Sequence, residues 1–176
     1  MINLVEERMP PMTTSKDAGA GKKLRAYETD YYGWLEDQAA LLKAGRLDEI
    51  DAQNIAEEIK DVGTRQYDRL ADITQALIFY VLKWDLQPDR RSQSMVFSID
   101  AHRDQISTLL KRNPSLAAEV RELLPDAYLF ATYDIMRDSD LPEKIFASEC
   151  PYDWDTLRTR LVEFDAVESP SASEFS

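Results

Sequence analysis

The chain has 176 residues, which suits one ordinary domain, and its composition of 44% apolar and 31% charged residues is typical of a soluble globular protein. A formal charge of −12 repels phosphate backbones, so we expect no nucleic-acid partner. A single cysteine excludes an internal disulfide and fits a reducing cytoplasm, and no apolar run approaches the ~20 residues of a membrane span.

The two ends of the chain show no structural period. Residues 1–26 mix proline, threonine and glycine with scattered lysine, and the last residues are rich in serine and acid. We therefore expect a disordered leader over residues 1–26, a single α-helical domain over 27–164 and a disordered acidic tail over 165–176.

The first helical pattern covers residues 30–44. Thr29 is a suitable N-cap and Gly45 a suitable stop. The apolar side of this helix carries Tyr31, Trp34, Leu35, Leu41 and Leu42.

A much longer helix is predicted from Asp51, an N-cap, to the Gln87–Pro88 pair, because a residue before proline avoids the α region. Gly63 weakens this helix, yet the apolar period keeps its phase across Gly63, so we expect one helix there, bent or straight. One stripe at three- and four-residue steps runs along it: Ile55, Ile59, Val62, Leu70, Ile73, Leu77, Val81 and Trp84.

The helix after the turn begins at Ser92, runs to residue 112 and folds back along the long helix. Asn113–Pro114 restarts the chain in a further helix, in which Pro125 predicts a kink, and Asp153 can cap a last short one. Short connections force antiparallel neighbours. The sequence therefore predicts an all-α, up-and-down antiparallel bundle of about four main helices with short C-terminal helices.

Several segments, in this order and spacing, resemble a bacterial family catalogued as domain of unknown function number twenty-nine. The resemblance covers roughly residues 27–157 and implies a compact all-α domain with no settled activity. In that family histidine tends to stand where this chain has Tyr80, and tryptophan where it has Met95. The matching segments are Tyr27-Glu-Thr-Asp-Tyr-Tyr-Gly-Trp34, Leu42-Lys-Ala-Gly-Arg-Leu-Asp48, Asn54-Ile-Ala-Glu-Glu-Ile59, Leu82-Lys-Trp84, Gln87-Pro88 with Arg91-Ser92, Asn113-Pro-Ser-Leu116 and Cys150-Pro-Tyr152.

Few residues suggest chemistry. Glu58 borders the buried stripe of the long helix and is a candidate cation ligand or catalytic acid, although a carboxylate paired for structural reasons is the commoner case. One histidine, one cysteine and no Glu-x-x-His pair predict neither a metal site nor a cofactor.

Basic residues gather where the long helix turns back. Arg90, Arg91 and Ser92 stand beside a helix N-terminus and could hold an anion, while Lys83 and His102 are further candidate site residues. The competing interpretation is that Lys83 complements the helix dipole and Arg91 pairs with a nearby acid.

Counting residues from the turn near residues 89–90 and from the turn at Asn113 places Tyr80, His102 and Tyr128 at the same height along the bundle. We expect them to form a buried polar layer, structural unless a cavity opens onto it.

Three functions remain open. The first is a non-enzymatic protein–protein binding or regulatory module, with a protein partner or a second copy of the chain. The second is a small enzyme acting on an anionic substrate near Arg91 and His102, or near Glu58. The third is an acidic, antitoxin-like partner of a basic protein, suggested by the ten acids and three bases of residues 138–176.

Overall fold

The computed structural model describes residues 23–139 and 141–164. Within these ranges there are five α-helices, four of them long, and no strand, so the all-α prediction is confirmed. The chain divides into two compact units, Met1–Glu58 and Ile59–Ser176. Most of the expected leader and all of the expected tail lie outside the described residues.

The first unit contains helix α1 (Tyr31–Lys43). Its N-cap is Asp30, whose Oδ1 accepts from the amide of Gly33 at 2.8 Å, so the prediction of Thr29 as cap is wrong by one residue. The carboxylate of Asp30 accepts the hydrogen of the third amide of the helix, which is the bond that defines an N-cap residue. Gly45 follows the helix with a φ of 69°, the left-handed conformation expected of a glycine stop.

An ion pair and an aromatic contact hold the segment before α1 in place. The guanidinium of Arg25 binds the buried carboxylate of Asp37 at 2.7 Å, and the ring of Tyr27 meets Trp34 edge-on at 4.9 Å. Arg25 falls in the range expected to be leader, and its contact with Asp37 lies twelve residues away in sequence.

Helix α2 (Ala52–Leu86) begins and ends as predicted. Asp51 accepts from the amide of Asn54 at its start, and Gln87–Pro88 follows its end. The helix includes Gly63, which has no atoms crowding its Cβ position and no positive φ. The apolar stripe is buried from Leu70 onward, whereas Ile59 and Val62 are 67% and 51% exposed.

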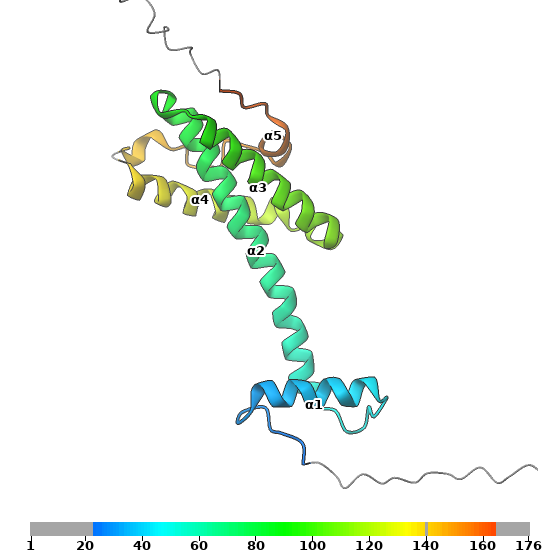
Figure 1. The fold of residues 1–176 in the computed structure, drawn as a ribbon. Coiled ribbons are helices and arrows are strands. Elements are labelled where there is room, and N and C mark those ends of the chain that lie inside the picture. The colour runs from blue at the N-terminus through cyan, green and yellow to red at the C-terminus, as the bar shows by residue number, and fades with distance from the viewer. Residues whose placement is uncertain (1–22, 140, 165–176) are drawn as a thin grey trace, which may run out of the picture. The chain divides into compact units, whose positions relative to one another are not determined.

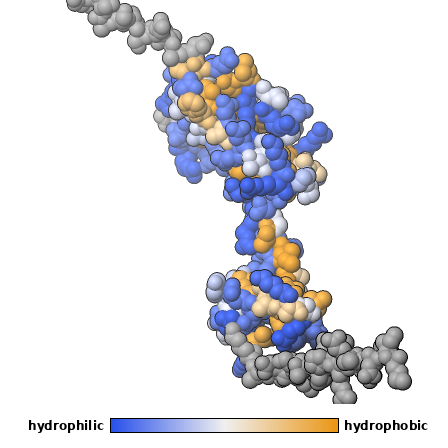
Figure 2. Space-filling model, turned by 45° about the vertical axis from the view of Figure 1, so that its right-hand side comes forward, coloured by the Kyte–Doolittle hydropathy of each residue, from blue (hydrophilic) through white to orange (hydrophobic). Residues whose placement is uncertain are grey.

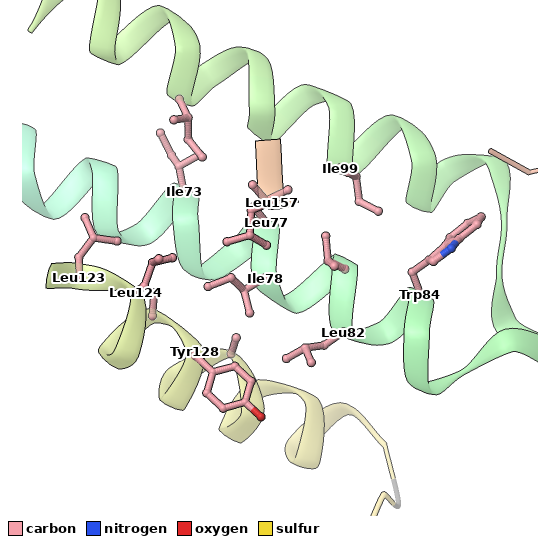
Figure 3. Close-up of a cluster of buried hydrophobic side chains, with 14 of the residues drawn as sticks. Ile73, Leu77, Ile78, Leu82, Trp84, Ile99, Leu123, Leu124, Tyr128 and Leu157 are labelled. Atoms are coloured by element: carbon pink, nitrogen blue, oxygen red, sulfur yellow. The ribbon is translucent and has the colours of Figure 1, made fainter. Parts of the chain in front are cut away.

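The second unit is built on the C-terminal half of α2. Helices α3 (Gln93–Arg112), capped by Ser92 as predicted, and α4 (Val120–Asp138) both lie against it (Figure 1). Figure 3 shows Ile99 of α3 facing α2, and Ile78 and Leu82 of α2 facing α4. The largest fully buried apolar side chains of this unit are Leu70, Leu77, Ile78, Ile99, Ile106, Ile135 and Leu157.

The prediction of a helix starting at Asn113–Pro114 is wrong. Pro114–Ala117 form a single 3-10 turn and α4 starts only at Val120. The side-chain amide of Asn113 donates to the carbonyl of Leu109, four residues earlier, at 3.0 Å. The side chain therefore terminates α3 instead of capping a new helix. Pro125 stands inside α4, which continues through it as expected.

The last described segment closes the second unit. It contains a 3-10 turn (Glu143–Ile145) and helix α5 (Trp154–Thr159), capped as predicted by Asp153. Leu157 enters the core with 1% exposure. None of the helices in the described ranges combines the length and the hydropathy needed to cross a membrane.

Candidate functional site

Glu58 is engaged within the first unit by two tyrosines. The hydroxyl of Tyr27 donates to Oε1 at 2.8 Å and that of Tyr31 to Oε2 at 2.5 Å. The hydrogen bond to Glu58 raises the pKa of Tyr27 to about 12. Both oxygens of Glu58 thus hold neighbouring aromatic side chains, and no set of three metal-ligating side chains exists among the described residues.

The turn between α2 and α3 uses Arg91 to close on Trp84. The Nε of Arg91 donates to the Trp84 carbonyl at 2.8 Å, and its guanidinium carbon lies 4.9 Å from the centroid of the indole ring. Ser92 accepts from the amide of Met95, and Arg90 is exposed beside it. The structure therefore gives Arg91 a carbonyl and an aromatic face as partners.

Lys83 joins α2 to α4. Its ammonium lies 2.5 Å from Oδ2 of Asp138 and 5.0 Å from the centroid of the Phe79 ring. The hydrogen bond from Lys83 lowers the pKa of Asp138.

Tyr80 and His102 are brought together across α2 and α3. Their rings stack with centroids 5.5 Å apart and planes 30° from parallel, and both residues are half-buried. Nδ1 of His102 lies 2.5 Å from the carbonyl oxygen of Ser98. The pair borders a cleft of about 520 Å³, which we call the His102 cleft.

Tyr128 does not line this cleft. Its hydroxyl donates to the carbonyl of Ala147 at 2.9 Å, and it borders a different cavity. Counting back from a turn gives the level of a residue along a helix but not the direction of its side chain, and this direction separates Tyr128 from Tyr80 and His102.

The larger cavity lies between α4 and residues 143–152, and we call it the α4 groove. Its volume is about 1020 Å³. Five charged residues also border it: Arg121, Asp126, Glu143, Lys144 and Glu149. The larger apolar and aromatic residues of its lining are Leu124, Tyr128, Leu129, Tyr133, Met136, Phe146 and Tyr152.

Apolar residues also project outward from α4. Leu129, Phe130 and Tyr133 are 44%, 52% and 54% exposed. On the opposite side of the same helix Ala131 and Ile135 are completely buried. This outer face was not foreseen from the sequence. Three adjacent apolar residues, Tyr128-Leu129-Phe130, are a signal for it, because successive residues point in different directions around a helix.

The wall of the α4 groove opposite the helix is fastened to α2 and α3. Asp85 accepts two hydrogen bonds from Arg160, at 2.7 and 2.5 Å, and one from the hydroxyl of Tyr152 at 2.7 Å. Arg103 donates to the carbonyls of Leu157 and Arg160. These contacts, unforeseen from the sequence, hold residues 152–160 and so position the segment that faces α4.

The Asp85 contacts shift the acidity of their members. Burial raises the pKa of Asp85, but the hydrogen bonds from Arg160 and Tyr152 outweigh burial and leave it below the ordinary value. Burial, and then the bond to Asp85, raise the pKa of Tyr152. The carboxylate is therefore ionised and Tyr152 neutral over the whole physiological range.

The comparisons with known proteins define the family. A family model described as Domain of unknown function DUF29 matches residues 26–160, which is most of the chain. The chain belongs to this family. Neither the curated proteins nor the solved structures give a match. The DUF29 match covers α1 to α5 and ends at Arg160, the partner of Asp85.

Proposed function

We propose that this DUF29 domain is a protein-interaction module that receives a basic amphipathic helix of a partner protein in the α4 groove. The observation that carries the proposal is the exposed apolar side of α4 beside a cavity of about 1020 Å³. Apolar side chains (orange) also reach the surface at several other places on the molecule (Figure 2). On α4 they border a cavity of about 1020 Å³.

The dimensions of the α4 groove suit a helix. Its lining runs along α4 from Arg121 to Met136, which at ~1.5 Å per residue is ~22 Å, the length of a helix of ~15 residues. Helices that bind in grooves insert large apolar side chains at three- and four-residue steps. Leu129, Tyr133 and Met136, themselves at such steps on α4, offer a matching row.

The charge of the protein favours a basic occupant. Three acids and two bases line the α4 groove, and the whole chain carries −12. Such a field accelerates association with a positively charged partner and disfavours an acidic one. Lysine or arginine residues that flank the apolar face of the bound helix would lie near Asp126, Glu143 and Glu149.

An enzyme that uses an anionic substrate finds less support. Such an enzyme needs Lys83, Arg91 and His102 to converge on one pocket. Arg91 is instead held on Trp84, and three aspartates line the His102 cleft. Glu58 has both oxygens occupied by tyrosines.

The proposal is tested with two fluorescent peptides of ~15 residues. Both carry leucine and phenylalanine at helical spacing, one with lysine and the other with glutamate at the remaining positions. We expect the lysine peptide to bind the full chain in fluorescence anisotropy titrations and the glutamate peptide to bind at least about tenfold more weakly.

Variants distinguish binding in the α4 groove from nonspecific hydrophobic binding elsewhere on the surface. Leu129→Ser and Tyr133→Ser should each weaken binding of the lysine peptide by about tenfold. The matched control is Leu161→Ser, which removes an apolar side chain that is 76% exposed and lies outside the α4 groove, and should change nothing. Equal binding by all variants, or no binding of the lysine peptide, would contradict the proposal.

A second contact surface is favoured by one further observation. Every residue of α2 from 59 to 65 is exposed, including Ile59 and Val62. A short helical segment without packing is marginal in water. We propose that a second copy of the chain covers this segment, as apolar helical stripes do when they pair.

Light scattering tests this self-association. The wild type should show twice the 20.2 kDa mass of one chain, and Ile59→Ser with Val62→Ser should return it to that mass. If the wild-type protein keeps a mass of 20.2 kDa at a concentration of tens of micromolar, the proposed self-association is contradicted.

A further inference from the structure

The His102 cleft differs from the α4 groove in both size and lining. It measures about 520 Å³, within the range of small-molecule pockets. Three helices build it: α2 supplies Asp72, Gln75, Ala76, Phe79 and Tyr80, α3 supplies His102, and α4 supplies Asp134, Arg137 and Asp138. The α2 residues follow three- and four-residue steps and so form one wall.

We propose that the His102 cleft binds a small organic cation carrying a primary ammonium or guanidinium group. The site lies outside the α4 groove, shares none of its lining residues and does not depend on the proposed docking of a helix.

His102 contributes a directed acceptor. A carbonyl oxygen accepts only, so Nδ1, at 2.5 Å from the Ser98 carbonyl, carries the hydrogen. In this tautomer the lone pair of the ring is on Nε2. The stacked ring of Tyr80 fixes the plane of the imidazole, so the direction of this lone pair is set before a ligand arrives.

Asp72 contributes the charge. It is an exposed residue of α2 that lines the His102 cleft, and within the described ranges its carboxylate takes part in no hydrogen bond or ion pair. Gln75, the next lining residue on α2, donates to Asp134 at 2.7 Å. Ala76 and Phe79 form an apolar floor for the methylene chain that connects the charged ends of such a ligand.

Two cationic side chains of the protein, one ammonium and one guanidinium, already contact residues that line this cleft. The ammonium of Lys83 lies between the carboxylate of Asp138 and the ring of Phe79. The guanidinium of Arg137 lies 2.7 Å from Asp134. Both contacts show that carboxylate and aromatic groups at this cleft have geometry that suits nitrogen cations.

The opposite charge and a metal ion fit the lining less well. Asp134 and Asp138 neutralise Arg137 and Lys83, so Asp72 leaves the cleft negative overall and repels an anion. No group of three histidine, cysteine or acidic side chains in the described part of the chain is placed to hold a metal ion.

Agmatine is the probe, because it carries a primary ammonium and a guanidinium on a short methylene chain. Isothermal titration of the full chain should give binding at millimolar or lower concentration, with glutarate, an anion of similar length, giving none. Asp72→Asn and His102→Phe should each weaken agmatine binding by about tenfold, and His102→Phe retains an aromatic ring against Tyr80.

The matched control is Asp68→Asn, which removes the same charge from an exposed position of α2 one turn away, outside the cleft. This variant should bind agmatine as the wild type does. If Asp68→Asn and Asp72→Asn weakened agmatine binding equally, the effect would be general charge attraction, and the proposed site would be wrong. Binding of glutarate as tight as that of agmatine, or no heat with agmatine at several millimolar, would overturn it too.

Discussion

The two sides of α4 have similar apolar side chains and opposite surroundings. On the inner side Ala131 and Ile135 have no exposed surface and pack into the core with α2. On the outer side Leu129, Phe130 and Tyr133 are about half exposed, and Leu129 and Tyr133 line the α4 groove. The inner side therefore serves the fold, and the outer side is the surface to which we propose that a partner binds.

The largest expected difference between the two sides is in stability. Ile135→Ala removes a fully buried side chain and should lower the free energy of unfolding by about 2–5 kcal/mol. Leu129→Ala, on the outer side, should change it by less than about 0.5 kcal/mol. Urea denaturation followed by circular dichroism measures both changes. Similar decreases in the free energy of unfolding for the two variants would contradict the distinction between the two sides.

The wall facing α4 provides the next test. Asp85→Ala leaves Arg160 and Tyr152 without their acceptor and should cost about 1–3 kcal/mol, by the same denaturation measurement. Because this wall lines the α4 groove, the variant should also weaken the lysine peptide, unlike Gly63→Ala. Unchanged peptide binding in a folded Asp85→Ala protein would show that the wall is not needed.

Acid should reproduce part of the Asp85 effect. The pKa of Asp85 in the folded protein lies below its ordinary value of about 4, so the unfolded chain takes up the proton first as pH falls. The stabilisation is therefore complete above about pH 5 and is lost as pH falls through the folded pKa. The gap in unfolding free energy between wild type and Asp85→Asn should narrow from pH 6 to pH 3, and a constant gap would contradict this.

The smallest expected effect is a gain. Gly63→Ala places a methyl group where no atom lies within 4 Å and should raise stability by about 0.5–1 kcal/mol, because alanine favours the helix more than glycine does. It should leave the binding of both peptides unchanged. Destabilisation would mean that the helix does not continue through residue 63.

Local signals made much of the fold predictable. Asp51, Ser92 and Asp153 were expected to cap helices and do so, and Pro88 marks the end of α2. These signals act over three or four residues, so the sequence contains them. Thr29 failed because Asp30, one residue later, has the stronger capping carboxylate.

The candidate sites were harder to foresee, since they depend on contacts between distant segments. Asp85 and Arg160 are 75 residues apart, and nothing in either neighbourhood marks them as partners. The stripe of α2 likewise predicts burial for Ile59 as strongly as for Leu77. Only the packing of α3 and α4 decides that Leu77 is buried and Ile59 is exposed.

The most direct test of the central claim is to locate a bound helix. The lysine peptide, carrying a benzophenone in place of one phenylalanine, is cross-linked to the full chain by light, and the attachment sites are mapped by mass spectrometry. We predict cross-links to Leu129, Tyr133 and Met136 of α4 and to residues 143–149 opposite, and we predict that excess unlabelled peptide abolishes them. Cross-links concentrated on α1, on residues 59–65 of α2 or around His102 would contradict it.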